Sequence, residues 1–274
     1  MTAALRRVLV RRPGGLERWR EFGWRAEPDA ARVEAEHEAL RAALADAGAE
    51  VVVAEPLAGN PDAVYVYDPA VIHEQGAVLL RPGKAARQAE PEALRAELER
   101  AGMTILGRLQ APAFAEGGDT VWLDEHTLAV GLGYRTNEAG AAALAEGFPN
   151  VDVLPFDLAH HRGPGEVLHL MSVLSPLDVD LALVHLPLMP ARLVQLLRAR
   201  GVSFVEAAAE EFETLACNVL ALGPRRVLAA DGNPETRRRL EAAGVEVAVY
   251  PAAELGLKGD GGPTCLTRPL VRAG

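Results

Sequence analysis

The chain has 274 residues, of which 49% are apolar and 24% are charged, so it has enough material for a large buried core. Twenty-eight Lys and Arg against 38 Asp and Glu leave a net charge of −10, which argues against a protein that coats nucleic acid or an anionic membrane surface. The two cysteines, Cys217 and Cys265, exclude a disulfide framework, and no apolar run approaches the about 18 residues of a membrane span. We therefore expect a cytoplasmic protein, and the repeat described next favours a single domain over residues 1–274.

A strand–helix–strand unit recurs along the chain. Each unit has a short β-branched strand, an Ala/Leu/Arg/Glu helix, a glycine after the helix, and then another strand. The expected first strands are Val8–Val10, Ala77–Leu80, Leu128–Val130, Leu181–Val184 and Val227–Ala229. The glycines expected to end the helices in a left-handed turn are Gly48, Gly102, Gly147, Gly201 and Gly244.

About five such units are typical of an α/β fold, either a doubly wound sheet or a radial arrangement. A doubly wound nucleotide-binding sheet needs a Gly-rich phosphate loop, and the nearest candidate, Gly131-Leu132-Gly133, lacks the third glycine of that pattern. The richest Gly/Pro stretches fall between the units. We therefore favour one pseudo-symmetric domain whose loops converge on a central site.

Two acidic segments carry candidate chemistry. In residues 60–69, Val64 and Val66 predict a strand that ends at Asp68, where the simpler interpretation is a strand-terminating turn. Farther along, Gly117 and Gly118 separate two carboxylates, Glu116 and Asp119. The glycines either let the backbone approach a ligand closely or form an ordinary hairpin turn.

The remaining candidates are basic residues, one histidine and the cysteines. Arg81 and Arg135 each follow a strand and could bind a carboxylate or face solvent. His169 stands between leucines and is either a core histidine or a catalyst, and no histidine spacing predicts a metal site. Cys265 lies in a Gly-rich loop, where a thiol is a candidate nucleophile, whereas Cys217 resembles a buried strand residue.

Taken in order, these motifs resemble one family. An Asn-Pro-Asp segment that runs to Asp68 is followed by Arg81-Pro82-Gly83, Glu116-Gly117-Gly118-Asp119, Arg135-Thr136-Asn137, Leu168-His169-Leu170 and a terminal Gly-Gly-x-x-Cys265. The ordered set is similar to the dimethylarginine dimethylaminohydrolases of the guanidine-modifying pentein superfamily, over residues 5–270. The resemblance implies a five-fold pseudo-symmetric αβ propeller.

The resemblance also implies a mechanism. Cys265, as thiolate, would attack the guanidinium carbon, and His169 would act as acid and then as base. Asp68 and Glu116 would grip the guanidinium. The implied substrate contacts further include Arg81 and Arg135 for the α-carboxylate, with Asp62, Leu16 and a covering loop over residues 12–24. The implied reaction, without cofactor or metal, converts Nω-methylated arginine (asymmetric dimethylarginine) to citrulline and methylamine or dimethylamine.

Two positions depart from the resemblance. Met171 stands where arginine deiminases have an Asp and many dimethylarginine hydrolases have a Lys, and Tyr67 stands where a Glu is common. Hydrolysis of arginine, amidino transfer to an acceptor amine, and guanidino binding without turnover therefore remain alternatives. We expect a small guanidino compound as the partner, with no nucleic acid or membrane. Outer helices could pair in a homodimer.

Overall fold

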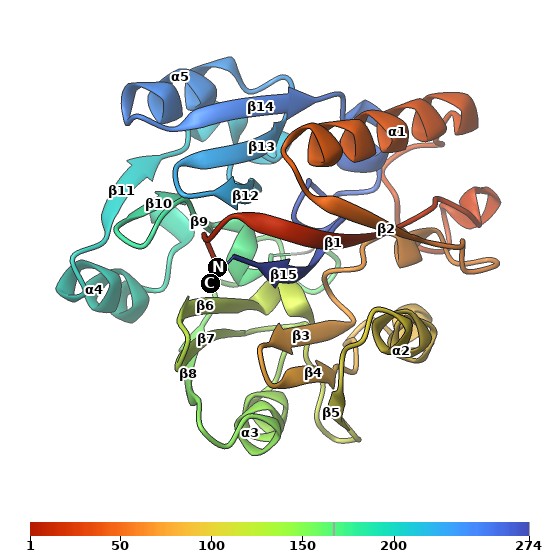
Figure 1. The fold of residues 1–274 in the computed structure, drawn as a ribbon, viewed down its shortest axis with the longest axis horizontal. Coiled ribbons are helices and arrows are strands. Elements are labelled where there is room, and N and C mark those ends of the chain that lie inside the picture. Colours follow the sequence, from red (N-terminus) through yellow and green to blue (C-terminus); the bar gives the residue numbers. More distant parts are fainter. Residues whose placement is uncertain (167, 274) are drawn as a thin grey trace.

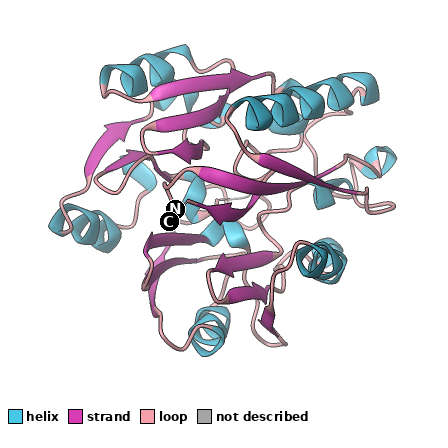
Figure 2. Cartoon of the chain, in the orientation of Figure 1, coloured by secondary structure: helices cyan, strands magenta, loops and turns pink. Residues whose placement is uncertain are grey.

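The computed structural model describes residues 1–166 and 168–273, and these residues form five three-stranded sheets arranged as a ring, as Figure 1 shows. In every sheet the middle strand pairs antiparallel with one neighbour and parallel with the strand that follows it in the chain. The parallel pair needs a crossover, and a helix supplies it in each unit. These helices lie at the periphery of the ring (Figure 2). The predicted five-fold αβ propeller is confirmed.

The five units follow the chain, except that the first borrows its inner strand from the C-terminal end. It contains β1 (Leu5–Arg11), α1 (Ala30–Asp46), β2 (Glu50–Ala54) and β15 (Arg268–Arg272). The second contains β3 (Ala70–His73), β4 (Gly76–Leu79), α2 (Glu90–Arg100) and β5 (Ile105–Arg108). The third contains β6 (Thr120–Asp124), β7 (Thr127–Leu132), α3 (Glu138–Gly147) and β8 (Asp152–Asp157).

The last two units complete the ring. The fourth contains β9 (Leu174–Pro176), β10 (Leu181–Val184), α4 (Ala191–Ala199) and β11 (Ser203–Glu206). The fifth contains β12 (Leu220–Gly223), β13 (Arg226–Ala230), α5 (Pro234–Ala242) and β14 (Glu246–Tyr250). The middle strands β1, β4, β7, β10 and β13 coincide with the five predicted strands to within a residue or overlap them fully.

Pairing of the first and last strands closes the ring. Leu5 in β1 lies opposite Arg272 in β15, and the backbone N–H of Ala273 donates to the carbonyl of Ala4 at 2.8 Å. Both chain ends lie near the centre of the ring in Figure 1. Because β15 begins three residues after Cys265, ring closure also fixes the loop that carries this thiol.

Apolar side chains fill the space between the sheets and their outer helices. Leu40 and Leu44 of α1 pack against Val8 and Val10 of β1, and all four are fully buried. Equivalent clusters lie under the other helices, so burial of each helix holds its unit together. In the described residues no helix is long and apolar enough to cross a membrane.

Three local predictions are wrong. The strand predicted from Val64 and Val66 to Asp68 does not form. Residues 61–64 are a 3₁₀ helix and residues 66–69 a turn, because Pro61 suits a helix start and Asn60 Oδ1 accepts from the N–H of Ala63 at 3.1 Å. Cys217 is buried, but it lies in the turn before β12. Gly147 is the last residue of α3 without a left-handed turn, and its missing Cβ makes room for Val78.

Candidate active site

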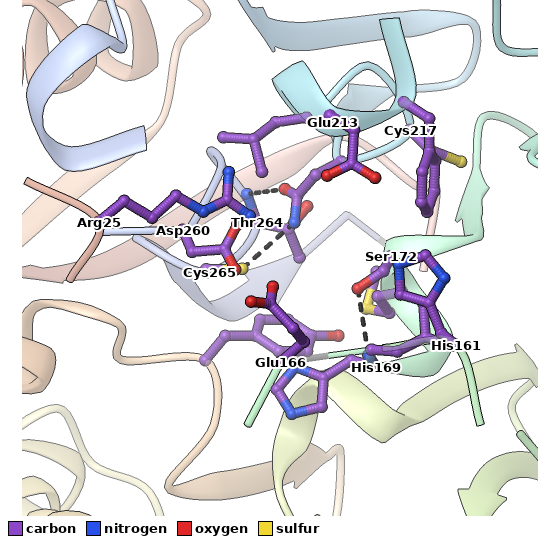
Figure 3. Close-up of a pocket in the computed structure, with 17 residues that line it drawn as sticks. Arg25, His161, Glu166, His169, Ser172, Glu213, Cys217, Asp260, Thr264 and Cys265 are labelled. Atoms are coloured by element: carbon purple, nitrogen blue, oxygen red, sulfur yellow. Dashed lines mark hydrogen bonds and ion pairs between the residues drawn. The ribbon is translucent and has the colours of Figure 1, made fainter. Parts of the chain in front are cut away.

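Two adjoining cavities open where the loops of the units converge. The larger has a volume of about 530 Å³ and the smaller, drawn in Figure 3, about 70 Å³. Residues that line both are Arg25, Glu166, His169, Asp260 and Cys265. The candidate nucleophile and the candidate acid–base therefore lie at the boundary between the two cavities.

Cys265 is held by an amide and stays protonated in the unliganded site. Asn218 Nδ2 donates to its sulfur at 3.2 Å, and Asn218 Oδ1 accepts from the N–H of Thr264 at 3.1 Å. Burial raises the pKa of the Cys265 thiol to about 12, and the negative charge of Asp68 adds to this effect. A second carboxylate, Asp260, raises this pKa further, whereas the hydrogen bond from Asn218 acts to lower it.

His169 forms an ion pair with Glu116. The distance from His169 Nε2 to Glu116 Oε2 is 2.9 Å, and both side chains are buried. Burial acts to lower the pKa of His169, but Asp119, Asp68 and Glu116 outweigh it and raise the pKa to about 9. Burial likewise opposes ionisation of Glu116, yet His169 and Arg135 hold the pKa of that carboxyl well below its usual range. His169 is therefore an imidazolium at neutral pH.

Two glycines bring this ion pair together. A Cβ on Gly118 would lie 2.4 Å from His169 Nδ1, and one on Gly117 would lie 2.1 Å from the carbonyl oxygen of Tyr67. Asp119 then fixes the histidine's segment, since its Oδ1 accepts from the N–H of Leu170 at 3.0 Å. The glycines thus let the backbone approach His169 and Tyr67 of the chain itself, and they form a 3₁₀ turn rather than the alternative hairpin.

Asp68 faces the same space from the second unit. Its Oδ2 accepts from Arg87 Nη1 at 2.7 Å and its Oδ1 from the N–H of Gly118 at 2.9 Å. Arg87 is buried and also pairs with Glu90, at 2.8 Å between Nη2 and Oε2. The buried guanidinium of Arg87 therefore compensates the charges of two carboxylates, as buried ions require.

Asp62 lies at the wall of the larger cavity. Trp24 Nε1 donates to its Oδ1 at 2.8 Å, and Lys84 Nζ lies 2.6 Å from its Oδ2. Lys84 Nζ also donates to the carbonyl of Phe22. These contacts tie the wall of the cavity to residues 22–24 of the expected covering loop.

The structure brings most of the predicted residues together. Cys265, His169, Asp68, Asp62 and Arg135 line one or both cavities, and Glu116 lies directly behind His169. Glu116 is fully buried, with its oxygens turned toward His169 and Arg135, so it is placed to orient the imidazole rather than to grip a guanidinium.

Arg81 and Leu16 are not brought to the site. Arg81 lies in a backbone bridge with Ala115, outside both cavity linings. Leu16 packs against the apolar cluster under α1, although Arg20, Phe22 and other residues near it do line the larger cavity. A position in a sequence motif does not reveal which of two faces a side chain occupies.

Sequence analysis missed three contributors: Arg87, Lys84 and Asn218. The three-residue spacing of Arg87 and Glu90 does not by itself mark a site residue. Arg95 and Arg100 form ion pairs at the same spacing, and neither belongs to the site. Asn218 follows the buried Cys217 and carries no motif of its own. These residues become recognisable only when the units meet in three dimensions.

One group of side chains has donor types that suit a metal ion: Asp68, Glu116 and His169 offer ligand atoms within 4.8 Å of one another. Their atoms are engaged with other partners, however. Arg135 and His169 occupy the oxygens of Glu116, and Arg87 and the N–H of Gly118 occupy those of Asp68. The arrangement is better suited to hold a proton and a planar cation than a divalent ion.

The geometry defines a class of protein: an αβ propeller of the pentein type, with a thiol, an imidazolium and buried carboxylates at the mouth of its central cavity. Residues 20–272 match the family described as N,N dimethylarginine dimethylhydrolase, eukaryotic, and the chain belongs to this family. The family and its neighbours are hydrolases that act on C–N bonds of amidines. The predicted resemblance is confirmed.

The individual relatives include a dimethylarginine dimethylaminohydrolase and also arginine deiminases. N(G),N(G)-dimethylarginine dimethylaminohydrolase of Pseudomonas aeruginosa is 28% identical, over 88% of this chain and 89% of its own length. Arginine deiminase of Mycobacterium marinum is 32% identical over 66% of this chain, which spans 55% of that protein's length. An uncharacterized protein of Aeropyrum pernix is 32% identical, over 83% of this chain and 80% of its own length.

Solved structures confirm the fold. The Pseudomonas aeruginosa enzyme complexed with citrulline superposes with a TM-score of 0.81 at 24% identity, over 96% of this chain and 98% of that one. The N-terminal domain of ArgZ, a cyanobacterial arginine dihydrolase bound to its product, superposes with a TM-score of 0.84 at 22% identity, over 97% of both chains.

Proposed function

We propose that this protein hydrolyses an Nω-methylated arginine to citrulline and a methylamine through a covalent intermediate on Cys265. The observation that carries the proposal is the placement of Cys265 and His169 at the boundary between a large charged cavity and a small one whose lining combines apolar and charged side chains. The charged cavity suits the amino-acid end of the substrate, and the small one suits a methylated nitrogen.

Charge in the larger cavity fits a zwitterionic amino acid with a cationic side chain. Its lining carries cations (Arg20, Arg25, Lys84, Arg87 and Arg135) and anions (Glu21, Asp62, Asp68, Glu166 and Asp260). A guanidinium bound at Asp68 would form charge-assisted hydrogen bonds there beside Arg87, and Arg135 is the cation that we assign to the carboxylate. Arg81 drops out of this assignment, because it does not line the cavity.

A substrate cation bound at Asp68 would make the Cys265 thiol easier to ionise. Because the negative charge of Asp68 helps to keep the thiol protonated, a guanidinium that neutralises this charge favours the thiolate. The thiolate adds to the guanidinium carbon, the bond to the methylated nitrogen breaks, and the imidazolium of His169 gives its proton to the departing amine. This leaves an S-alkylthiouronium on Cys265 and a neutral imidazole.

Water completes the cycle. It adds to the thiouronium carbon and gives one proton to the neutral imidazole of His169. The carbon–sulfur bond then breaks, the second proton of the water passes to the sulfur and replaces the one that the thiol released to solvent at the start, and citrulline leaves. Glu116 stabilises the imidazolium throughout, at 2.9 Å from Nε2. The His169–Glu116 pair is thereby returned to its starting charge.

The smaller cavity favours an alkylated leaving group. Its lining combines the apolar side chains of Met171, Leu168, Leu215 and Phe212 with the charged groups of Arg25, Glu166, Glu213 and Asp260. Met171 stands where arginine deiminases have a carboxylate. A volume of about 70 Å³ accommodates a group larger than a single water molecule, and methyl groups that pack on the apolar part of the lining would bury apolar surface.

Arginine itself is a second candidate substrate, because the mycobacterial arginine deiminases are more nearly identical to this chain than the Pseudomonas enzyme is. Both reactions give citrulline, but one releases ammonia and the other a methylamine. The test is to incubate the protein with asymmetric dimethylarginine and with arginine, and to quantify citrulline, dimethylamine and ammonia separately. Citrulline with dimethylamine, and little from arginine, supports the proposal; citrulline only from arginine overturns the substrate assignment.

The covalent step has its own test. In an acid-quenched reaction, mass spectrometry is expected to find an amidine adduct on the peptide that contains Cys265. Turnover with no adduct at any quench time, and with no effect of Cys265→Ser, would refute the thiouronium mechanism. Citrulline from neither compound would direct the search to other guanidines or to an acceptor amine.

A further inference from the structure

Asp260 has a backbone conformation that L-residues rarely adopt. Its φ is +67°, and it is flanked by Gly259 and Gly261 in the loop that leads to Cys265. The flanking positions admit no side chain, since a Cβ on Gly259 would lie 1.9 Å from the hydroxyl of Tyr65 and one on Gly261 would lie 2.3 Å from its ring. A glycine at position 260 would adopt this conformation without strain. The presence of an aspartate there instead indicates that its carboxylate has a role.

The carboxylate of Asp260 contacts the N-terminal part of the chain. Arg25 Nη2 lies 3.0 Å from Asp260 Oδ1, and Figure 3 shows the two side chains meeting beside Cys265. Two further bonds join the same segments: the N–H of Arg25 donates to the carbonyl of Lys258 at 2.7 Å, and Lys258 Nζ donates to the carbonyl of Glu27 at 3.0 Å. Residues 16–25, here named the cover segment, are therefore attached to the loop of the nucleophile.

The ion pair lies at the edge of the substrate space. Arg20, Phe22 and Gly23 of the cover segment line the larger cavity, whereas Arg25 and Asp260 line both cavities. Burial raises the pKa of the Asp260 carboxyl, and the carboxylates of Glu166 and Glu213 add to this effect, whereas Arg25 and His169 act to lower it. Among the described residues, Arg25 is the ion-pair partner of Asp260. Without Arg25, a half-enclosed carboxylate would stand unpaired near two others, which is costly.

We propose that Arg25 and Asp260 are positioning residues that form a latch: their ion pair holds the cover segment closed over the substrate and, through the loop at 259–262, holds Cys265 in its attacking position. The proposal rests on the proposed function only in taking Cys265 as the nucleophile. When the ion pair is broken, substrate can still enter, but the cover segment and Cys265 are held less firmly. Both KM and kcat therefore change. Neither residue needs to touch the substrate.

Proteolysis tests the latch without any substrate. Trypsin cleavage after Arg18 and Arg20, located by mass spectrometry, is expected to start about fivefold faster in Asp260→Asn than in the wild type, because an unlatched segment opens more often. Asn tolerates the left-handed conformation, so this variant keeps the loop geometry. The matched control is Glu38→Gln, which breaks an exposed ion pair with Arg41 on α1 and should change cleavage by less than about twofold.

Kinetics give the second measurement, with the substrate that turnover assays identify. Arg25→Gln and Asp260→Asn should each lower kcat/KM about tenfold, and the double variant should be no worse than either single one, because the pair acts as a unit. Arg25→Lys should recover most of the loss. Additive losses, or wild-type cleavage of the cover segment in Asp260→Asn, would overturn the latch. Absence of turnover with either methylarginine or arginine would count against the proposed function and leave the cleavage result intact.

Discussion

At the scale of single residues, the site contains a protonated thiol beside a protonated imidazole. The pKa of Cys265 is raised to about 12 and that of His169 to about 9, so neither group is in its nucleophilic or basic form at neutral pH. In the proposed mechanism, a cation that binds at Asp68 favours ionisation of the thiol, so the selectivity for a cationic substrate and the activation of Cys265 would depend on the same charge.

The two cysteines should respond differently to substitution. Cys265→Ser is expected to lower kcat by at least about a thousandfold, because a serine hydroxyl is a far weaker nucleophile here, while Cys217→Ser should keep most of the activity. Cys217 is fully enclosed, and burial raises the pKa of its thiol, so it is unsuited to attack. Citrulline formation by both variants decides between them; activity that depends on Cys217 and not on Cys265 would contradict the assignment.

The acid role of His169 sets an alkaline limit on turnover. Since the imidazolium donates a proton to the leaving amine, and its pKa is about 9, kcat should fall about tenfold per pH unit above pH 9. Glu116→Gln removes the carboxylate 2.9 Å away, so the alkaline limit should move to lower pH. A pH–rate profile of the wild type and this variant measures both effects, and a limit that stays at the same pH would refute the coupling.

At the scale of elements, the turn before β6 controls how closely two units approach. Gly118→Ala places a methyl group 2.4 Å from His169 Nδ1, so the imidazole must rotate away from Glu116. We expect loss of most activity and a destabilisation of about 1–3 kcal/mol. Gly102→Ala is the control: this glycine has a positive φ but open space around it, so it should cost stability and spare catalysis. Thermal unfolding and citrulline assays of both variants separate these effects.

Sequence could predict the elements that depend on local pattern. The five middle strands carry apolar runs, and their predicted bounds agree with the structure to within a few residues. Four of the five predicted helix-ending glycines have a positive φ. The strand predicted to end at Asp68 is wrong, because Val64 and Val66 alternate as in a strand while the Asn60 cap and Pro61 favour a 3₁₀ turn.

The site could be predicted only in part. Cys265, His169, Glu116 and Asp68 belong to short ordered motifs, so their positions were recognisable. Arg87 contacts Asp68 across 19 residues and Asn218 contacts Cys265 across 47, and no local pattern encodes such distances. Sequence analysis named Arg81 and missed Arg87 for a similar reason. Both residues follow β4, and only the packed structure shows that Arg87 is the one that contacts Asp68.

At the scale of the whole molecule, the ring is closed by strands from opposite ends of the chain. The N–H of Ala273 lies 2.8 Å from the carbonyl of Ala4, so a short Gly/Ser linker should join the two ends without strain. A circular permutant opened at the exposed turn of Asp231 and Gly232 should then retain activity. Deleting residues 268–274 should instead expose β1 and abolish turnover. Citrulline assays and thermal unfolding of both proteins check this; an inactive but folded permutant would show that the order of synthesis matters.

The closing of the ring by β15 also makes the chemistry depend on completed folding. The thiol lies three residues before the last strand, while Asp68 precedes the second sheet and His169 lies between the third and fourth. The pairing of β15 with β1 therefore helps to set the position of Cys265 relative to both groups. A substitution that loosens this pairing would disturb the site without changing any residue that lines it.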